Sequence, residues 1–233
     1  MMIGKGVEDI DIRMPKDVYD SDRHESTFNV YLTVVVRDEK GRVINVHRQR
    51  SHSPTYNFRT AILPEQWYQE TGTGASWTNT SGTTNTITGI PDGTHALISY
   101  PNSNTNYQTY LVGIIVGTGQ QSNPASAYNL AAPISNGSGA GQLLYQAPTL
   151  PSQIMKNGNS AYFYIEQTYV NQSGGTVTIT EVGIVVEVYL TEYSGSPSYN
   201  QGNILMWYDV LSSPISVPNG GSVTIYYTFT VNP

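Results

Sequence analysis

Cysteine is absent from this chain of 233 residues, which excludes a disulfide framework and any site built on thiolates. Long hydrophobic runs are absent too, since no stretch approaches the roughly 18 consecutive apolar residues of a membrane-spanning helix. Residues 1–22 contain no apolar core of the kind that marks a secretory signal, so we expect no export by that route. These absences predict a protein that is made inside a cell and is not inserted in a membrane.

Charged residues are scarce over most of the chain. Residues 1–70 hold 10 of the 11 lysines and arginines and 11 of the 17 aspartates and glutamates. The other 163 residues contain only Lys156, Asp92, Glu166, Glu181, Glu187, Glu192 and Asp209. Catalysis usually requires clustered ionisable groups, so this distribution favours a structural or binding protein over an enzyme. We expect no enzymatic activity and no cofactor.

Net charge and polar composition narrow the class of partner. The formal net charge of −6 and the pI near 5.1 argue against nucleic-acid binding, which requires a basic face. The 18 tyrosines and the abundant Asn, Ser and Thr are typical of a surface that meets the outside of a cell. A virus particle reconciles this surface with the missing secretory signal, because its parts assemble in the host cytoplasm and later leave it.

Short β-branched and aromatic runs, separated by turn residues, recur along the chain. Phe28–Arg37 and Arg42–Arg48 are predicted to pair as a hairpin through a turn at Asp38–Gly41. Further strands are expected at Ala96–Tyr100, Tyr107–Val116, Leu143–Tyr145, Tyr162–Val170, Thr176–Glu181, Gly183–Leu190, Ile204–Leu211 and Val223–Val231. No amphipathic helix is evident. The predicted fold is all-β, a jelly-roll-like antiparallel β-sandwich with an N-terminal arm.

Two regions fall outside this strand pattern. Residues 1–28 mix charges of both signs and are predicted to form the arm, either as a free terminus or as a tail that orders against a neighbouring subunit. Residues 29–233 are predicted to form the β-sandwich domain. Within that domain, residues 71–94 are nearly all Gly, Ser, Thr and Asn, which indicates a long surface loop with one short strand near Thr86–Ile90.

The last run of the chain alternates two kinds of side chain. Val223, Ile225, Tyr227, Phe229 and Val231 share one face of the expected strand, and Ser222, Thr224, Tyr226, Thr228 and Thr230 share the other. We expect the first set to face the core. The Thr-rich set is expected to face solvent or an interface.

The residues predicted to contact a partner are mainly basic. Arg42, His47, Arg48, Arg50 and Arg59 form the chain's one basic cluster. It is interpreted as a contact with an acidic surface of a partner subunit, as a contact with packaged nucleic acid, or as a solvated hairpin edge whose charges prevent pairing between edges. Trp77 is the other candidate, because a tryptophan in the expected loop suggests that neighbours order that loop.

Other residue types indicate no catalytic or metal site. The four histidines, His24, His47, His52 and His95, lack metal-ligand spacing. Gly117-Thr118-Gly119 lacks the lysine of a phosphate-binding loop and is interpreted as a turn. Glu166, Glu181 and Glu187 are interpreted as outward-facing strand positions, and Glu181 is the most unusual because it lies between two runs.

Aromatic residues have two interpretations. A set of tyrosines and tryptophans could stack on sugar rings, or it could serve the core and protein interfaces. The set comprises Tyr100, Tyr107, Tyr110, Tyr162, Tyr164, Tyr226, Tyr227, Trp67, Trp77 and Trp207. A host-surface glycan is therefore an alternative partner.

Several strings resemble those of virion structural proteins from tailed phages and thermophilic archaeal viruses. They are VVVRDEKGRVINVHRQRSHS at Val34–Ser53, VGTGQQSNPASAYNLAAPI at Val116–Ile134, NQSGGTVTITEVGI at Asn171–Ile184 and DVLSSPISVPNGGSVTIYYTFTV at Asp209–Val231. The resemblance implies that the last string closes a β-sandwich, and it brings no catalytic residues. The long loop at 71–94 departs from the phage pattern.

Together these observations predict a non-enzymatic structural protein of a virion, such as a capsid, turret, spike or tail component. Its expected partners are copies of itself and other virion proteins. The alternative is a carbohydrate-binding or host-recognition module, which glycan binding by the isolated protein would favour.

Overall fold

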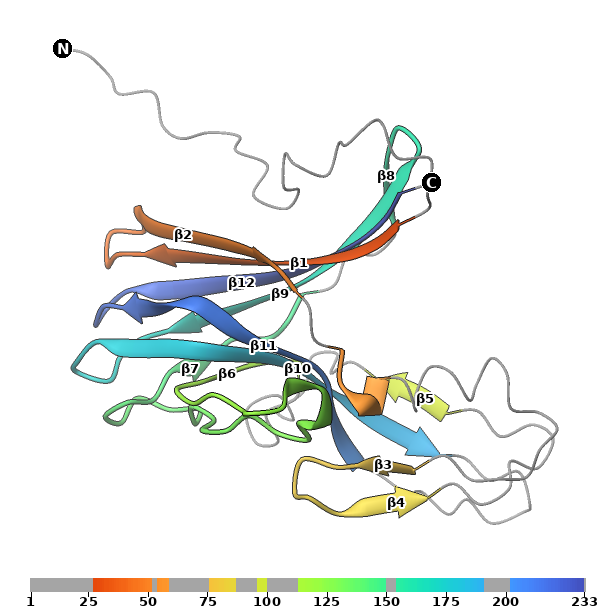
Figure 1. Cartoon of the computed structure of the whole chain (residues 1–233). Coiled ribbons are helices and arrows are strands. Elements are labelled where there is room, and N and C mark those ends of the chain that lie inside the picture. The colour runs from red at the N-terminus through yellow and green to blue at the C-terminus, as the bar shows by residue number, and fades with distance from the viewer. Residues whose placement is uncertain are drawn as a thin grey trace, which may run out of the picture.

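The chain folds into two antiparallel β-sheets that lie one above the other (Figure 1). This computed structural model describes residues 27–51, 54–58, 76–86, 96–99, 113–149, 154–190 and 202–232. Its strands are β1 (Thr27–Arg37), β2 (Val43–Arg50), β3 (Ser76–Thr78), β4 (Thr84–Thr86), β5 (Ala96–Ser99), β6 (Gly113–Gly117), β7 (Leu144–Tyr145), β8 (Met155–Asn157), β9 (Ser160–Val170), β10 (Val177–Leu190), β11 (Gly202–Val217) and β12 (Ser222–Asn232). The predicted all-β, sandwich-like architecture is confirmed.

The larger sheet has six strands in the order β2-β1-β12-β9-β7, and β8 also pairs with β9. The first and last described strands, β1 and β12, are therefore neighbours and pair from Thr27↔Asn232 to Arg37↔Ser222. The predicted hairpin is confirmed, because β2 pairs antiparallel with β1 through the turn at residues 38–42. This order leaves β2 at one edge of the sheet.

The smaller sheet is built on the long strand β10. β11 pairs with one side of β10, while β5 and β6 pair with successive parts of its other side. The sequence predicted two separate strands, Thr176–Glu181 and Gly183–Leu190, but β10 is one strand of 14 residues. The register of β10 against β11 shifts next to Glu181 and after Ile184. These bulges interrupt the alternation of side chains in the sequence, but the strand continues through them.

The core lies between the two sheets and is built mainly from β1, β6, β9, β10, β11 and β12. On β12, Val223, Ile225, Tyr227 and Phe229 are buried in it as predicted, whereas Val231 is 47% exposed. The other face of β12 was expected to meet solvent or an interface. It is instead covered within the chain: Thr228 is 1% exposed, and the residues opposite it on β1 and β9 are the larger Tyr31 and Tyr164.

All four phenylalanines of the chain join Trp207 in one aromatic row. The ring of Phe229 stacks on Phe163 at 4.7 Å, contacts Trp207 edge-on at 5.5 Å and lies 6.3 Å from Phe28. Phe58 contacts the other side of Trp207 at 4.7 Å. These residues come from β1, β9, β11, β12 and the segment after β2, so the row ties both sheets together.

Parts of the predicted arm and loop differ from expectation. The strand β1 begins at Thr27, inside the expected arm, and residues 1–26 lie outside the described residues. Within the expected loop of 71–94, β3 and β4 pair as a short hairpin from Ser76↔Thr86 to Thr78↔Thr84. The remainder of that loop lies outside the described residues.

Candidate functional site

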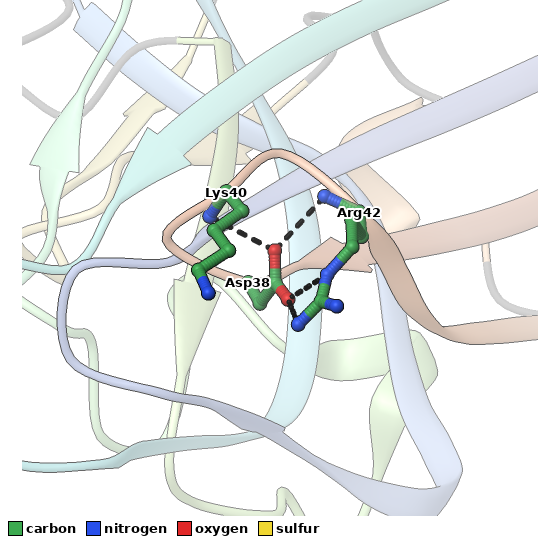
Figure 2. A network of polar contacts seen from close by, with 3 residues as sticks. All are labelled: Asp38, Lys40 and Arg42. Atoms are coloured by element: carbon green, nitrogen blue, oxygen red, sulfur yellow. Dashed lines mark hydrogen bonds and ion pairs between the residues drawn. The ribbon is translucent and has the colours of Figure 1, made fainter.

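The turn between β1 and β2 is held by one carboxyl group, that of Asp38 (Figure 2). Its Oδ1 accepts hydrogen bonds of 2.9 Å from the backbone N–H groups of Lys40 and Arg42. Its Oδ2 lies 2.7 Å from both Nε and a terminal nitrogen of the Arg42 guanidinium. These contacts, the Arg42 side chain foremost, hold the pKa of Asp38 below its ordinary value. Gly41 closes the turn at a φ of +76°.

Strand β2 is an edge strand with little cover on either face. Among the described strands it pairs only with β1. Three apolar side chains lie close together on it, and Val43 is 45%, Ile44 53% and Val46 44% exposed. Edge strands of soluble proteins are normally protected by charges, prolines or covering segments, because their free backbone groups can pair with another chain. The first half of β2, where its pairing with β1 shifts register between Val36 and Arg37, therefore presents an apolar sheet edge.

The predicted basic cluster lies along and beside this edge. Arg42 pairs with Asp38, and Arg48 and Arg50 are exposed. A guanidinium nitrogen of Arg50 donates to Asn29 Oδ1 at 2.5 Å. The ring of His47 contacts Gln49 Oε1 at 2.9 Å and the Ser213 hydroxyl at 3.4 Å. Arg59 lies outside the described residues, as does His52.

The far end of β2 is anchored to the smaller sheet by an amide side chain. Gln49 Nε2 donates to the carbonyl oxygen of Val210, and Gln49 Oε1 accepts from the backbone N–H of Ser212, both at 3.0 Å. The Gln49 side chain thus makes hydrogen bonds to the β11 backbone of the kind that a neighbouring strand would make. This anchor fixes where the edge strand sits, but it leaves residues 43–46 open.

Trp77 lies in a different environment from the basic cluster. It is 5% exposed and belongs to the main core. The β3–β4 hairpin that carries it is attached by Asn57, whose amide donates to Thr78 O at 2.7 Å and accepts from Thr78 N at 2.9 Å. The indole Nε1 of Trp77 is buried without an acceptor within the described ranges. The loop is ordered here by the chain itself, through this core contact.

Glu181 was expected to face outward, and this expectation is wrong. Its side chain is completely buried. Its carboxyl oxygens accept hydrogen bonds from the backbone N–H groups of Gly119, Ala131 and Ala132 at 2.8–3.1 Å and from the Tyr208 hydroxyl at 2.8 Å. The segment of residues 118–134 covers the outer face of β10 and β11, so this carboxyl group fastens that segment to the sheet (Figure 1).

The Gly117-Thr118-Gly119 string, interpreted as a turn, serves the same contact. A Cβ atom at Gly117 would collide with the Glu181 side chain and lie 2.7 Å from the carbonyl oxygen of Ala132. A Cβ atom at Gly119 would lie 2.6 Å from the Cβ atom of Ala131. These two glycines therefore allow the backbone to approach the buried carboxyl group closely.

Sequence reasoning missed a second buried carboxyl group, that of Asp209. Its Oδ2 accepts from the hydroxyl groups of Ser51 at 2.6 Å and Tyr227 at 2.9 Å, and Ser51 Oγ accepts in turn from Trp207 Nε1 at 2.5 Å. Burial is the main cause that raises the pKa of Tyr227 well above its ordinary value, and the nearby charge of Asp209 raises this pKa further. The only available signal was an aspartate inside an apolar run, at 204–211.

The predicted aromatic set does not gather on one surface. Trp207 and Tyr227 are in the core, and Tyr100, Tyr107, Tyr110 and Trp67 lie outside the described residues. Tyr164 and Tyr226 meet edge-on at 6.1 Å on the outer face of the larger sheet, where both are mostly buried. Tyr162 shares that face by strand alternation and is half-buried. Glu166, also there, is half-buried, and the side chain of Glu187 is not described.

The described residues contain no group of three or more His, Cys, Asp or Glu residues placed to hold a metal ion. No helix among them is long and apolar enough to cross a membrane. Comparison of the chain with protein-family models, with curated proteins and with solved structures finds no match.

Proposed function

We propose that this chain is a non-enzymatic structural protein of a virion, assembled in the host cytoplasm into or onto a capsid, turret, spike or tail. Its partners are copies of itself and other virion proteins. The observation that carries the proposal is the exposed apolar sheet edge at Val43, Ile44 and Val46. A strand edge of this kind supports association through backbone hydrogen bonds and side-chain packing.

The buried ionisable groups support a structural role. Glu181 binds three backbone N–H groups and a phenol, and Asp209 binds two hydroxyl groups. Both carboxyl groups are therefore engaged in holding segments of the fold together. A catalytic carboxyl group needs to reach a substrate, and neither of these is accessible from the surface.

The finer form of the fold proposal is a jelly-roll-like arrangement. Two features support it: the first and last described strands are neighbours in one sheet, and the chain passes from the smaller to the larger sheet between β11 and β12. The resemblance of Asp209–Val231 to the closing strands of virion proteins points the same way.

The proposal is tested by imaging and by particle association. Negative-stain electron microscopy of the purified protein is expected to show rings, spikes or shells at high concentration. Antibodies against the chain are expected to label virus particles. A protein that stays monomeric at every concentration and never accompanies particles would refute the proposal.

A carbohydrate-binding module is the second candidate. It is favoured by Tyr162, which is half-buried on the outer face of the larger sheet, with the half-buried Glu166 on the same face of β9. Aromatic rings stack on sugars, and a carboxyl group accepts hydrogen bonds from sugar hydroxyls. Saturable glycan-array binding that is lost on Tyr162→Ala would support this candidate over assembly alone.

A further inference from the structure

We propose that the N-terminal segment, residues 1–26, packs on the outer face of the larger sheet of its own chain and forms a covering layer there. The outer face is the one turned away from the smaller sheet (Figure 1). The segment lies outside the described residues, but the face that it would cover is described. This contact belongs to the isolated chain, so it stands or falls apart from the virion proposal.

The first support is that the outer face is dry. An antiparallel sheet with one face in water normally carries polar, solvated side chains on that face. Here Val35 is 0%, Thr33 2% and Thr228 1% exposed. All three point outward, because the residues that alternate with them along β1 and β12 are in the main core. Side chains this dry on the outside of a sheet require a layer above them, since strands of the same sheet lie only beside them.

The second support is an apolar cluster on this face. It consists of Val35 of β1, Tyr164 of β9 and Tyr226 of β12, with Met155 of β8 packed against it. All four strands belong to the larger sheet, and the smaller sheet contributes no described residue to the cluster. A sheet face that carries an apolar cluster buries it against another element. The covering element is therefore sought in the part of the chain outside the described residues.

The N-terminal segment is the stretch in the right place. The burial is found in a single chain, so the cover belongs to that chain. The other long undescribed stretches, within 59–112 and at 191–201, adjoin strands that lie outside the larger sheet. Residues 150–153 are too few to form a layer. The N-terminal segment leads directly into β1, and its last twelve residues, about 40 Å when extended, can span the roughly 36 Å length of that strand.

The third support is complementary charge. The N-terminal segment contains seven acidic and four basic residues, which gives a net charge of −3. Exposed Arg48 and Arg50 of β2 point to the outer side, because His47 and Gln49, which alternate with them, reach β11 on the inner side. The face carries three described basic residues and one acidic residue, namely Arg37, Arg48, Arg50 and Glu166. Segment and face therefore attract each other.

The fourth support is the pattern of one run within the segment. Residues 9–14 have the sequence DIDIRM, in which charged and apolar side chains alternate. This alternation is typical of a strand with one face buried and the other in water. Ile10, Ile12 and Met14 form the apolar face, which matches the cluster at Val35, Tyr164 and Tyr226. The charged residues between them remain on the solvent side of the layer.

The experiment measures the reactivity of single cysteines, which the native chain lacks. Thr33→Cys places a thiol of nearly equal volume on the outer face. Val34→Cys places one in the core, and Val46→Cys places one on β2, where Val46 is 44% exposed. Each variant is made in the full chain and in a chain without residues 1–26. Alkylation by iodoacetamide, followed by mass spectrometry, gives the rates.

In the full chain, Thr33→Cys is expected to react as slowly as Val34→Cys. Removing residues 1–26 is expected to raise the Thr33→Cys rate by at least about tenfold, because its thiol then reacts without waiting for a rare opening. Val34→Cys should stay slow and Val46→Cys fast in both chains. A fast Thr33→Cys in the full chain, or a slow one in both chains, would overturn the inference. Protection that disappears on dilution would overturn it too, because the cover would then come from another copy.

A pair of full-length variants decides the matter if the truncation also loosens the core. Ile12→Ser removes an apolar contact with the face and is expected to raise the Thr33→Cys rate by at least about threefold. Arg13→Ser, on the solvent side of the same run, is the matched control and should leave the rate unchanged. Equal rates in the two variants would refute the covering layer. Oligomers seen by electron microscopy alongside an unprotected Thr33→Cys would leave the virion proposal standing and refute the layer alone.

Discussion

The hydroxyl of Tyr208 donates a 2.8 Å hydrogen bond to Glu181 Oε2, and both residues are completely buried on the outer face of the smaller sheet. Tyr208 Oη also accepts from the backbone N–H of Gln121 at 2.6 Å. The two side chains, from neighbouring strands, thus hold the same covering segment at two points. This segment converts what would be a solvent-facing sheet surface into a second buried layer.

Replacing the buried carboxyl group should destabilise the fold. Glu181→Gln places an amide N–H₂ where three backbone N–H groups and a phenol donate, so at least one donor loses its acceptor. We expect a loss of at least about 2 kcal/mol in the free energy of unfolding. Urea melts are the measurement, and Glu166→Gln, on a half-buried strand position, is the control with an expected loss under about 0.5 kcal/mol. Equal losses at the two positions would contradict the role of Glu181.

A methyl group at Gly117 should have a similar effect by a steric route. Its Cβ would lie 2.7 Å from the carbonyl oxygen of Ala132, which is backbone and cannot rotate away. Gly117→Ala is expected to cost about 1–3 kcal/mol, the usual range for overpacking. Gly175→Ala is the control, since no atom lies within 4 Å of the added methyl group. A neutral Gly117→Ala in thermal melts would show that residues 118–134 can shift freely.

The burial of both faces of β12 predicts that substitutions on either face destabilise the fold. Phe229→Ala should cost roughly 3–5 kcal/mol, because it removes the centre of the aromatic row. Thr228 is 1% exposed, so Thr228→Ala should cost more than the roughly 0.5 kcal/mol of a surface substitution. Urea denaturation of both variants is the test. A neutral Thr228→Ala would mean that its face of the sheet opens readily to water.

The buried tyrosines predict loss of stability in alkali. Burial is the largest cause that raises the pKa of Tyr145, Tyr208 and Tyr227 above the ordinary value of 10.0. A group whose folded pKa is raised contributes stability below its unfolded pKa, and this stability is lost as the pH rises through the folded value. Stability should therefore fall steadily above pH 10.

Ultraviolet absorbance of phenolate measures this directly. Native protein is expected to retain protonated tyrosines at a pH where the urea-unfolded chain has ionised all 18. Tyr227→Phe should reduce the number that remain protonated by one. Identical titration curves for the folded and unfolded chains would refute the prediction.

Sequence alone determined the class of fold and most of the strands. Alternation of β-branched and aromatic residues, with turn residues between, is a local signal, and it located the β1–β2 hairpin, β7, β9 and β12. The turn at Asp38 was equally readable, because its chemistry lies within five residues. The sequence identified Glu181 as unusual, but it did not show that the side chain is buried.

Tertiary structure decided which polar residues are buried and which strand is left open. Glu181 meets Ala131 and Ala132, about fifty positions away, and Asp209 meets Ser51 from the opposite end of the chain. Trp77 looked like a contact for a partner, but it packs into the core. The sequence suggests that Thr228 is a surface residue, but in the fold it lies opposite Tyr31 of β1 and Tyr164 of β9. No local pattern encodes such pairings, because the order of strands in a sheet depends on contacts far apart in sequence. That same order places β2 at the edge, where its apolar residues remain exposed.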